Sequence, residues 1–308
     1  MDRRLGEGFV FIGGTGRSGT NILRKTLDAH ESVVSLDFEH RFIIDPDGVI
    51  DLLNSYSACW SPFNADKRLK RFNEFLEGLA TKDSSSSGYA EWELATHFKR
   101  FFELRQRLMD GLIDCKYSGT WPGADQNGDG LIWLGKPLHR EELVALLSEF
   151  IVENISDLLV RDSSTHYVED NTWNMLYARE LVELMPRAKL LHVHRDPRDV
   201  VASFLHQRWC PDGLDQAVMM YKSLMRRIME AEAGLDHSQC MRVSLERFVD
   251  DTSIVLTEIC NFIGAAFSHR LFDVELSKES MGRWQQDFNF SERNYLNSEL
   301  KQYIDEFA

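Results

Sequence analysis

A glycine-rich turn near the N-terminus carries the first residues that could do chemistry. The turn spans residues 13–20, GGTGRSGT, between the apolar run Phe9–Ile12 and a segment whose apolar side chains recur at helical spacing. This pattern predicts a buried strand, a turn and a helix. A helix N-terminus after such a turn binds anions, because free N–H groups and the helix dipole both face the ligand. We therefore expect this turn to bind a phosphate or a similar oxyanion.

The spacing of the glycines leaves the class of ligand open. Residues 14–19 match the dinucleotide fingerprint GxGxxG, and Asp37 or Glu39 lies near the expected acidic position. A nicotinamide-dependent reductase of the short-chain type is therefore one hypothesis, although no Tyr-x-x-x-Lys pair occurs in the chain to support it. The spacing also half matches a nucleotide P-loop, but Thr20 and Asn21 stand where that motif has Lys-Ser/Thr. A hydrolase or kinase of ATP or GTP is not favoured.

A second group of polar residues lies at the end of another predicted strand. Lys189–His194 has a strand pattern, Arg195 follows at its carboxyl end, and Pro197 begins a predicted helix that contains Ser203. Open α/β sheets bind ligands at the carboxyl ends of their strands. Arg195 and Ser203 could thus reach one phosphate group. The structural alternative is a surface ion pair of Arg195 with Asp196 that caps the helix.

Together the two motifs resemble those of sulfotransferases that use 3′-phosphoadenosine 5′-phosphosulfate (PAPS). Phe11–Leu23 resembles the family's 5′-phosphosulfate loop, and Lys189–Ser203 resembles its 3′-phosphate motif. Cys240–Asp251 is similar to the late strand and helix of the family. Gly282–Trp284 is similar to the C-terminal element whose basic residue reaches the 3′-phosphate. The resemblance covers most of the chain, but not the stretch from about 51 to 164.

The resemblance implies a donor site made of backbone N–H groups, two hydroxyls and arginines. Arg17 would stabilise the leaving phosphate, and arginine and serine side chains would hold the 3′-phosphate. The implied donor-binding residues are Thr15, Gly16, Arg17, Ser18, Gly19, Thr20, Asn21, Arg195, Ser203 and Arg283. The donor would be PAPS, which leaves as adenosine 3′,5′-bisphosphate (PAP). No metal is expected, because arginine neutralises the charge.

The resemblance also implies a catalytic base. Leu27–His30 and Phe38–Phe42 are most similar to the tyrosylprotein sulfotransferase branch of the family. By that resemblance Glu39 is the base, its neighbour Arg41 is a substrate-binding residue, and His40 is a reserve base. The alternative is that Glu39 and Arg41 form a structural ion pair beside the second predicted strand.

One position departs from the family pattern. Relatives carry a lysine that steadies the transferring sulfuryl group, and Asp170 stands at that place here. Lys116 or Lys136 could substitute for it, or Arg17 could act alone. Glu169 and Asp170 would put negative charge near the site. We therefore predict both as substrate-binding residues and expect a cationic acceptor, such as a guanidinium or amine natural product. The missing lysine also leaves open a non-catalytic relative that only binds the donor.

The elements that position these residues follow from the periodicity of apolar side chains. Strand and helix patterns alternate at both ends of the chain, which predicts an α/β fold with a doubly wound parallel sheet, and the family resemblance implies that this sheet is P-loop-like. Helical patterns dominate residues 51–164 and predict an insertion that caps the site, within a single domain over residues 1–308. Strands are expected at 9–12, 33–36, 166–169, 189–194 and 240–244, and helices at 69–79, 92–112, 140–159, 173–185, 197–207, 215–233 and 248–263, with loops at 84–88 and 120–135.

One of these loops has a partial metal-binding pattern. Asp125, Asn127 and Asp129 resemble the first half of a calcium loop that runs to Ile132. Lys136 occupies the place of the final glutamate, so a polar turn is the expected structure.

Composition limits the class of partner. The chain has 308 residues with 35 Lys and Arg against 49 Asp and Glu, which gives a formal charge of −14. An acidic chain is a poor candidate for binding nucleic-acid polymers or anionic membranes, although placed arginines can still bind a small anion. The five cysteines form no CxxC pair, and no apolar run reaches transmembrane length. We expect a cytoplasmic enzyme with a small-molecule acceptor, and the sequence leaves the oligomeric state open.

Overall fold

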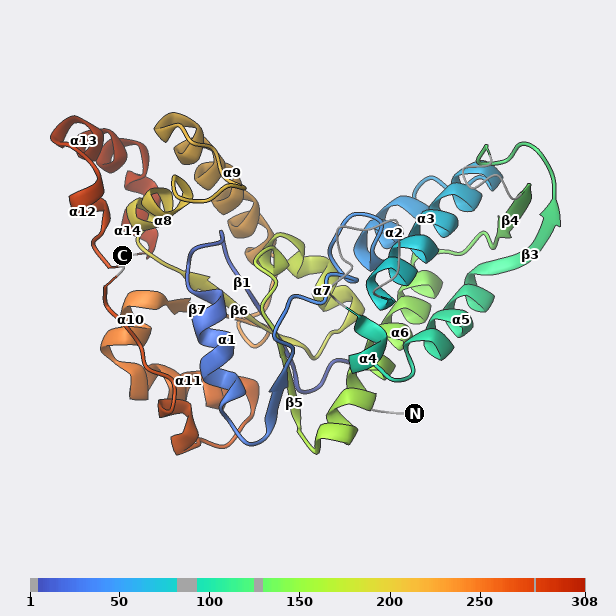
Figure 1. Cartoon of the computed structure of the whole chain (residues 1–308), viewed down its shortest axis with the longest axis horizontal. Helices are drawn as coiled ribbons and strands as arrows, with labels where there is room; N and C mark the ends of the chain where they lie inside the picture. The colour runs from blue at the N-terminus through green and yellow to red at the C-terminus, as the bar shows by residue number, and fades with distance from the viewer. Residues whose placement is uncertain (1–4, 82–92, 125–129, 280, 308) are drawn as a thin grey trace. The chain divides into compact units, whose positions relative to one another are not determined.

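The computed structural model of the chain describes residues 5–81, 93–124, 130–279 and 281–307. The chain divides into two compact units, which are described separately (Figure 1). The sheet unit comprises residues 8–35, 165–182 and 187–308, and the insertion unit comprises residues 1–7, 36–164 and 183–186. The insertion unit begins at Leu36, whereas the helical pattern placed its start near residue 51, so the segment around Glu39 belongs to it.

Five parallel strands form the centre of the sheet unit, in the order β2-β5-β1-β6-β7. The strands are β1 (Phe9–Gly13), β2 (Val33–Ser35), β5 (His166–Glu169), β6 (Lys189–His194) and β7 (Cys240–Ser244). In the central strand β1, Val10 pairs with Val168 on one side and Lys189 on the other. All of β1 is buried, which explains its continuous apolar sequence. The predicted α/β class and parallel sheet are confirmed.

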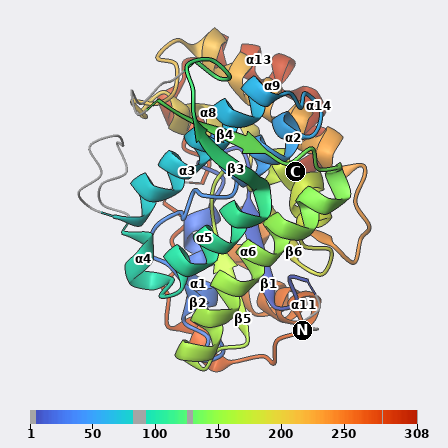
Figure 2. The same ribbon diagram turned by 90° about the vertical axis from the view of Figure 1, so that its right-hand side faces the viewer.

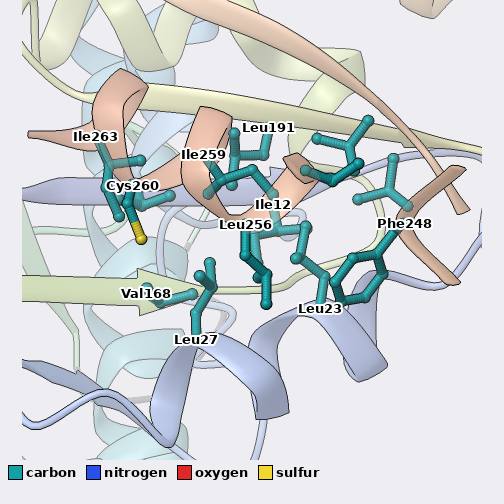
Figure 3. Packing of buried hydrophobic residues seen from close by; sticks show 14 of the residues in the cluster. Ile12, Leu23, Leu27, Val168, Leu191, Phe248, Leu256, Ile259, Cys260 and Ile263 are labelled. Carbon is teal, nitrogen blue, oxygen red and sulfur yellow. The ribbon is translucent and has the colours of Figure 1, made fainter. Parts of the chain in front are cut away.

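Helices pack on both faces of this sheet, with α1 and α11 on one face and α9 and α14 on the other. The helices of the unit are α1 (Thr20–Asp28), α8 (Pro197–Phe204), α9 (Leu214–Glu232), α10 (Leu245–Asp250), α11 (Thr252–Ile263), α12 (Trp284–Asp287), α13 (Phe290–Glu299) and α14 (Lys301–Phe307), with α7 (Ala178–Leu184) ending in the insertion unit. Figure 3 shows Leu23 and Leu27 of α1 meeting Leu256 and Ile259 of α11 over one face. This cluster holds α1, and with it the glycine-rich turn, against the strands.

The opposite face of β6 carries a polar cluster. His192 lies 2.9 Å from the Glu232 carboxylate of α9, and Arg242 of β7 donates to the same carboxylate from Nη2 at 2.8 Å. The Arg242 guanidinium also lies 4.8 Å from the ring centre of Phe307 in α14. Burial raises the pKa of Glu232, but the hydrogen bonds from His192 and Arg242 outweigh it and lower that pKa to about 2. The cluster therefore joins α9 and α14 to the sheet.

Two helix predictions in the sheet unit are wrong in detail. The single helix expected over 248–263 is two helices, α10 and α11, which meet at Asp251. Ser244 starts α10 directly after β7, because its hydroxyl accepts from the backbone N–H of Arg247. The helix expected from residue 173 begins as a 3-10 turn, Asn174–Tyr177, before α7.

The insertion unit is mainly helical (Figure 2). Its elements are α2 (Val49–Tyr56), α3 (Pro62–Ala80), α4 (Leu94–His97), α5 (Phe101–Leu112), α6 (Arg140–Asp162) and the strands β3 (Ile113–Ser118) and β4 (Leu131–Gly135). Its core includes Phe42, Phe101 and Phe150, whose rings pack edge to face at 5.6–6.1 Å. In the described part of the chain, no helix is long and apolar enough to span a bilayer.

The sequence did not predict the β3–β4 hairpin. Residues 120–135 were expected to be a loop, and residues 92–112 to be one helix, where the structure has α4 and α5. Most of β3 is exposed, so it lacks the alternating apolar pattern of a half-buried strand. A buried pair on α3 holds the hairpin instead: Asp66 accepts from the backbone N–H of Trp133 at 2.8 Å, and Lys70 donates to the carbonyl of Leu131. The predicted loop at 84–88 and the partial calcium-loop pattern at 125–129 lie outside the described residues.

The lowered pKa of Glu232 predicts a specific loss of stability in acid. The ionised carboxylate stabilises the fold fully above about pH 4.5, and this contribution disappears as the pH falls toward about 2. Glu232→Gln should therefore lower the free energy of unfolding by about 3 kcal/mol at pH 7. The difference from wild type should shrink between pH 5 and 2.5, measured by urea unfolding. Glu230→Gln on the same helix is the control, because Glu230 is exposed. A difference independent of pH would contradict the assignment.

Candidate functional site

The glycine-rich turn between β1 and α1 has the backbone conformation of an anion-binding nest. Gly16, Arg17 and Gly19 have positive φ angles of 81°, 58° and 106°. Successive residues of this kind form concave nests that bind anions. Gly14 permits the close approach, since a Cβ atom there would lie 2.4 Å from the carbonyl oxygen of Val193. Gly19 is the N-cap of α1 and has no side chain to bind the first N–H groups of the helix.

The polar side chains of the turn differ in their surroundings. Ser18 is 1% exposed, and its hydroxyl has no hydrogen-bond partner among the described residues. Thr15 donates to the carbonyl of Gly16 at 3.1 Å, and Asn21 donates to Asp170 at 3.5 Å. A buried hydroxyl without a partner is costly. Ser18 is therefore the group in the turn that an additional ligand would satisfy.

Three of the predicted donor-binding residues contact one another. Nε of Arg17 donates to the hydroxyl of Ser203 at 2.9 Å, and Nη1 of Arg195 donates to the carbonyl of Arg17 at 3.4 Å. Because Ser203 accepts from Arg17, its own hydroxyl hydrogen can be donated elsewhere. The Arg17 side chain is exposed, and Arg195 is buried. The ends of the neighbouring strands β1 and β6 thus bring two arginines and a serine to one place.

A residue not predicted from the sequence holds this group in position. Asp199, four residues after Arg195 on α8, lies 3.4 Å from Nη2 of that arginine and is buried. Its carboxylate also accepts from the backbone N–H groups of Gly282 at 2.7 Å and Trp284 at 3.0 Å. The expected alternative pair, Arg195 with Asp196, is not the one formed, because Asp196 binds Arg198 at 2.7 Å. The i, i+4 spacing of Arg195 and Asp199 is the sequence signal from which this ion pair could have been predicted.

Arg283 lies beside this C-terminal segment with partners of its own. Its Nε donates to Asp287 at 2.8 Å, and its Nη2 lies 3.1 Å from Nε2 of His206. The side chain is about half exposed. Its role at the 3′-phosphate stays a prediction.

An aromatic side chain that the sequence analysis missed lies against the turn. The ring of Trp209 would meet a Cβ atom on Gly16 at 2.9 Å, so this glycine allows the contact. The same ring packs edge to face against Trp173 and near Phe204, with both centroid distances 5.9 Å. Trp209 is half exposed, so the turn is bordered by an aromatic surface.

The carboxylates of Glu169 and Asp170 are buried and have partners within the sheet unit. Asp170 lies 3.3 Å from Nε of Arg24 in α1. Burial raises the pKa of Asp170, and Arg24 opposes that shift. Glu169 accepts from the backbone N–H of Asn171 at 3.0 Å and from the Asn174 amide at 2.5 Å. This placement favours a structural role for both residues, in place of the substrate-binding role predicted from their charge.

The predicted base and its neighbours lie in the insertion unit. Nη2 of Arg41 donates to Glu39 at 3.0 Å, and Nη1 donates to Asp45 at 3.1 Å. The ion pair named as the structural alternative is thus present, and it does not exclude a role for Glu39 as a base. His40 is buried beside Phe42, with a ring separation of 4.7 Å, and burial lowers its pKa to about 3. A base this weak is poorly matched to neutral pH, which argues against His40 as the reserve base.

Lys116 and Lys136, the two candidates to replace the family's lysine at position 170, both contact groups other than an anion. Nζ of Lys116 lies 3.9 Å from the ring centre of Trp133, and Nζ of Lys136 donates to the carbonyls of Asp110 and Gly111, both at 2.9 Å. Among the described residues, no group of three or more His, Cys, Asp or Glu side chains is arranged to hold a metal ion.

A family model described as the sulfotransferase family matches residues 10–269. The chain belongs to the sulfotransferase family. The matched range contains the glycine-rich turn, Glu39, and the Arg195 and Ser203 motif. The match therefore favours a sulfotransferase over the nicotinamide-dependent reductase that the GxGxxG spacing had left open.

Solved structures of sulfotransferases resemble the chain at low sequence identity. The sulfotransferase domain of an olefin synthase from Synechococcus PCC 7002 is 18% identical, with 93% of this chain and 85% of that chain covered and a TM-score of 0.47. A sulfotransferase from Alicyclobacillus acidocaldarius is 12% identical, with coverages of 99% and 97% and a TM-score of 0.44. Retinol dehydratase, solved with androsterone and inactive cofactor PAP, is 14% identical, with coverages of 97% and 81% and a TM-score of 0.38. No match is found among curated proteins.

The buried pair of Arg24 and Asp170 predicts a charge-dependent loss of stability. Arg24→Met should lower the free energy of unfolding by about 3–5 kcal/mol, because it leaves Asp170 buried and unpaired. Asp170→Asn in the Arg24→Met background should recover part of this loss by removing the stranded charge, as measured by denaturant unfolding. Lys25→Met, an exposed position on the same helix, is the control. No recovery in the double variant would mean that Arg24 acts through packing alone.

Proposed function

We propose that this sulfotransferase moves the sulfuryl group of PAPS to a hydroxyl or amine of a small-molecule acceptor. The observation that carries the proposal is the contact of Arg17 with Ser203 and Arg195 at the ends of β1 and β6. PAPS has a 5′-phosphosulfate and a 3′-phosphate, so its recognition needs two anion sites on one surface. A nest of N–H groups and a pair of arginines match that need.

The turn fits the 5′ end of such a donor. Positive φ angles at Gly16, Arg17 and Gly19 expose backbone N–H groups, and Ser18 has a buried hydroxyl with no partner in the described part of the chain. The positive end of α1 adds to the attraction for an anion. We assign the turn to the phosphosulfate, with Thr15, Thr20 and Asn21 contributing backbone N–H groups.

The second part of the group fits the 3′ end. Arg195 is held by Asp199 and by the carbonyl of Arg17, so its guanidinium is oriented before any ligand binds. Ser203 can donate its hydroxyl hydrogen, because Arg17 already donates to its oxygen. We assign both residues to the 3′-phosphate and Arg283 to its outer side. Orientation in advance reduces the entropy lost on binding.

The chemistry that these residues would perform is positioning and charge stabilisation. When bound, PAPS supplies a sulfuryl group whose bond to the bridging phosphate oxygen breaks as the acceptor oxygen or nitrogen attacks in line. Arg17 would stabilise the negative charge that develops on the leaving phosphate. Glu39 would take the proton released by the acceptor. With Asp170 at the place of the family's lysine, Arg17 is the residue we assign to the transferring group.

The proposed range of acceptors is not restricted to cationic molecules. A cationic acceptor was expected from the charges of Glu169 and Asp170. In the structure, however, Asp170 forms an ion pair with Arg24, and the Asn174 amide donates a hydrogen bond to Glu169. These two carboxylates do not support a preference for cations. The proposal therefore covers hydroxyl and amine acceptors alike.

Binding of PAP tests the donor site. Arg195→Ala should weaken PAP by about 10- to 150-fold, because a hydrogen bond to a charged group contributes about 1.5–3 kcal/mol. Isothermal titration calorimetry measures this directly. Arg198→Ala is the matched control from the same motif, since its guanidinium is bound to Asp196, and it should change the affinity little. Unchanged PAP affinity in Arg195→Ala, or displacement of PAP by NADPH, would refute the proposal.

Substitution of the base separates binding from catalysis. Glu39→Gln should keep the affinity for PAP but lower sulfuryl transfer about 10²- to 10⁴-fold, the usual contribution of a general base. Release of PAP from PAPS, followed by chromatography with a panel of phenols, alcohols and amines, gives the rate. Donor binding by the wild-type chain without transfer to any member of the panel would instead support a non-catalytic relative.

A further inference from the structure

The segment that carries Glu39 is a tight turn built around a single arginine. Arg41 has a φ angle of 58°, in the left-handed region that non-glycine residues seldom occupy. The backbone N–H of Phe42 donates to the carbonyl of His40 at 2.6 Å, and that of Asp45 donates to the carbonyl of Arg41 at 3.1 Å. Such a conformation persists only when surrounding contacts determine it.

Two carboxylates bind opposite ends of the Arg41 guanidinium. Nη2 donates to Glu39 at 3.0 Å, and Nη1 donates to Asp45 at 3.1 Å. The side chains of Glu39 and Arg41 are 29% and 32% exposed, whereas that of Asp45 is only 8% exposed. Asp45 is therefore the inner member of the group and Glu39 the outer one.

Backbone hydrogen bonds fix the segment from which the Asp45 carboxylate reaches Arg41. Its carbonyl accepts from the N–H of Gly48 at 2.9 Å, and the preceding residues Phe42 and Ile43 are buried. Their carbonyls accept from the N–H groups of Val49 and Ile50, which join the turn to α2, both at 2.9 Å. A carboxylate held this way can orient an arginine, and the arginine can orient a second carboxylate.

The negative charge of Asp45 also affects the proton affinity of Glu39. A guanidinium beside a carboxylate favours its ionised form and so weakens it as a proton acceptor. A second carboxylate on the same guanidinium offsets this effect. Among the described residues, titratable groups of the same segment include His40, neutral because burial lowers its pKa to about 3, Asp37, which acts on His97 of α4, and Asp47, which pairs with Arg71 at 2.7 Å.

We propose that Asp45 is a positioning residue for Glu39 and acts through Arg41. This inference rests on the proposed role of Glu39 as the base. In the reaction, the acceptor O–H or N–H proton moves to the Glu39 carboxylate, the acceptor atom bonds to sulfur, and the bond from sulfur to the bridging oxygen breaks, which releases PAP. Asp45 takes no proton in this step. It sets the direction and the basicity of the carboxylate that does.

The substitution Asp45→Asn tests the link without requiring turnover. It keeps the shape of the side chain but removes the charge that shares Arg41. In the full-length chain labelled with [δ-¹³C]glutamate, the Glu39 signal, identified by its absence in Glu39→Gln, should titrate at a lower pH by about half a unit or more. Asp110→Asn is the control, because Asp110 is exposed in the last turn of α5, where its carboxylate accepts from the Gln106 amide at 2.7 Å, and it should leave the Glu39 titration unchanged.

Turnover gives the second readout. Release of PAP from PAPS, with 2-naphthol or water as acceptor, should show a lower kcat for Asp45→Asn, an unchanged KM for PAPS and an acid limb moved to lower pH. Asp45→Glu should recover part of the rate. An unchanged Glu39 titration in Asp45→Asn would overturn the inference. A shifted titration with transfer that does not depend on Glu39 would leave the link between the side chains intact and refute the base proposed above.

Discussion

The buried ion pair between Arg195 and Asp199 is the interaction on which the candidate donor site depends. Both side chains are almost fully buried, so each would be costly without the other. Asp199 also binds the N–H groups of Gly282 and Trp284, which draws a segment from the far end of the sequence to α8. Arg195 in turn reaches the carbonyl of Arg17. One carboxylate thus connects the glycine-rich turn, the end of β6 and the C-terminal segment.

Local pairing of charges also limits the repulsion that a formal charge of −14 would exert on an anion at the glycine-rich turn. Two carboxylates near the turn have partners that reduce their repulsion of an anion: Asp170 is paired with Arg24, and Glu169 accepts a hydrogen bond from Asn174. Arg17 meanwhile contacts a neutral serine and remains exposed. Local pairing, and not the total charge, sets the field at the turn.

The sequence predicted the parts of the molecule whose signals are local. The apolar run of β1, the glycines of the turn and the proline that begins α8 lie within a few residues of the groups they position, so the sheet and the donor motifs were found. The β3–β4 hairpin was missed because the Asp66 and Lys70 pair that secures it comes from α3, more than 50 residues earlier. Asp199 was not predicted, although its i, i+4 spacing with Arg195 was a local signal, because its other partners, Gly282 and Trp284, are distant in sequence. Trp209 was missed because the turn that it contacts at Gly16 is distant in sequence. The substrate-binding roles of Glu169 and Asp170 stay predictions, because the sequence shows the charge of these side chains but not their burial beside Asn174 and Arg24.

The two units fix their functional side chains by different means. In the sheet unit, Arg17 and Arg195 stand where parallel strands end, and the hydrogen-bonded ladder of the sheet sets their positions. In the insertion unit, Glu39 lies on a turn that hydrogen bonds from the N–H groups of Val49 and Ile50 join to α2, and its ion pair with Arg41 orients the side chain. Arg195 has a buried ion pair in addition to the sheet, whereas the ion pair of Glu39 is partly exposed. In the proposed role of Glu39 as the base, the contacts that orient its carboxylate also set how strongly it attracts a proton.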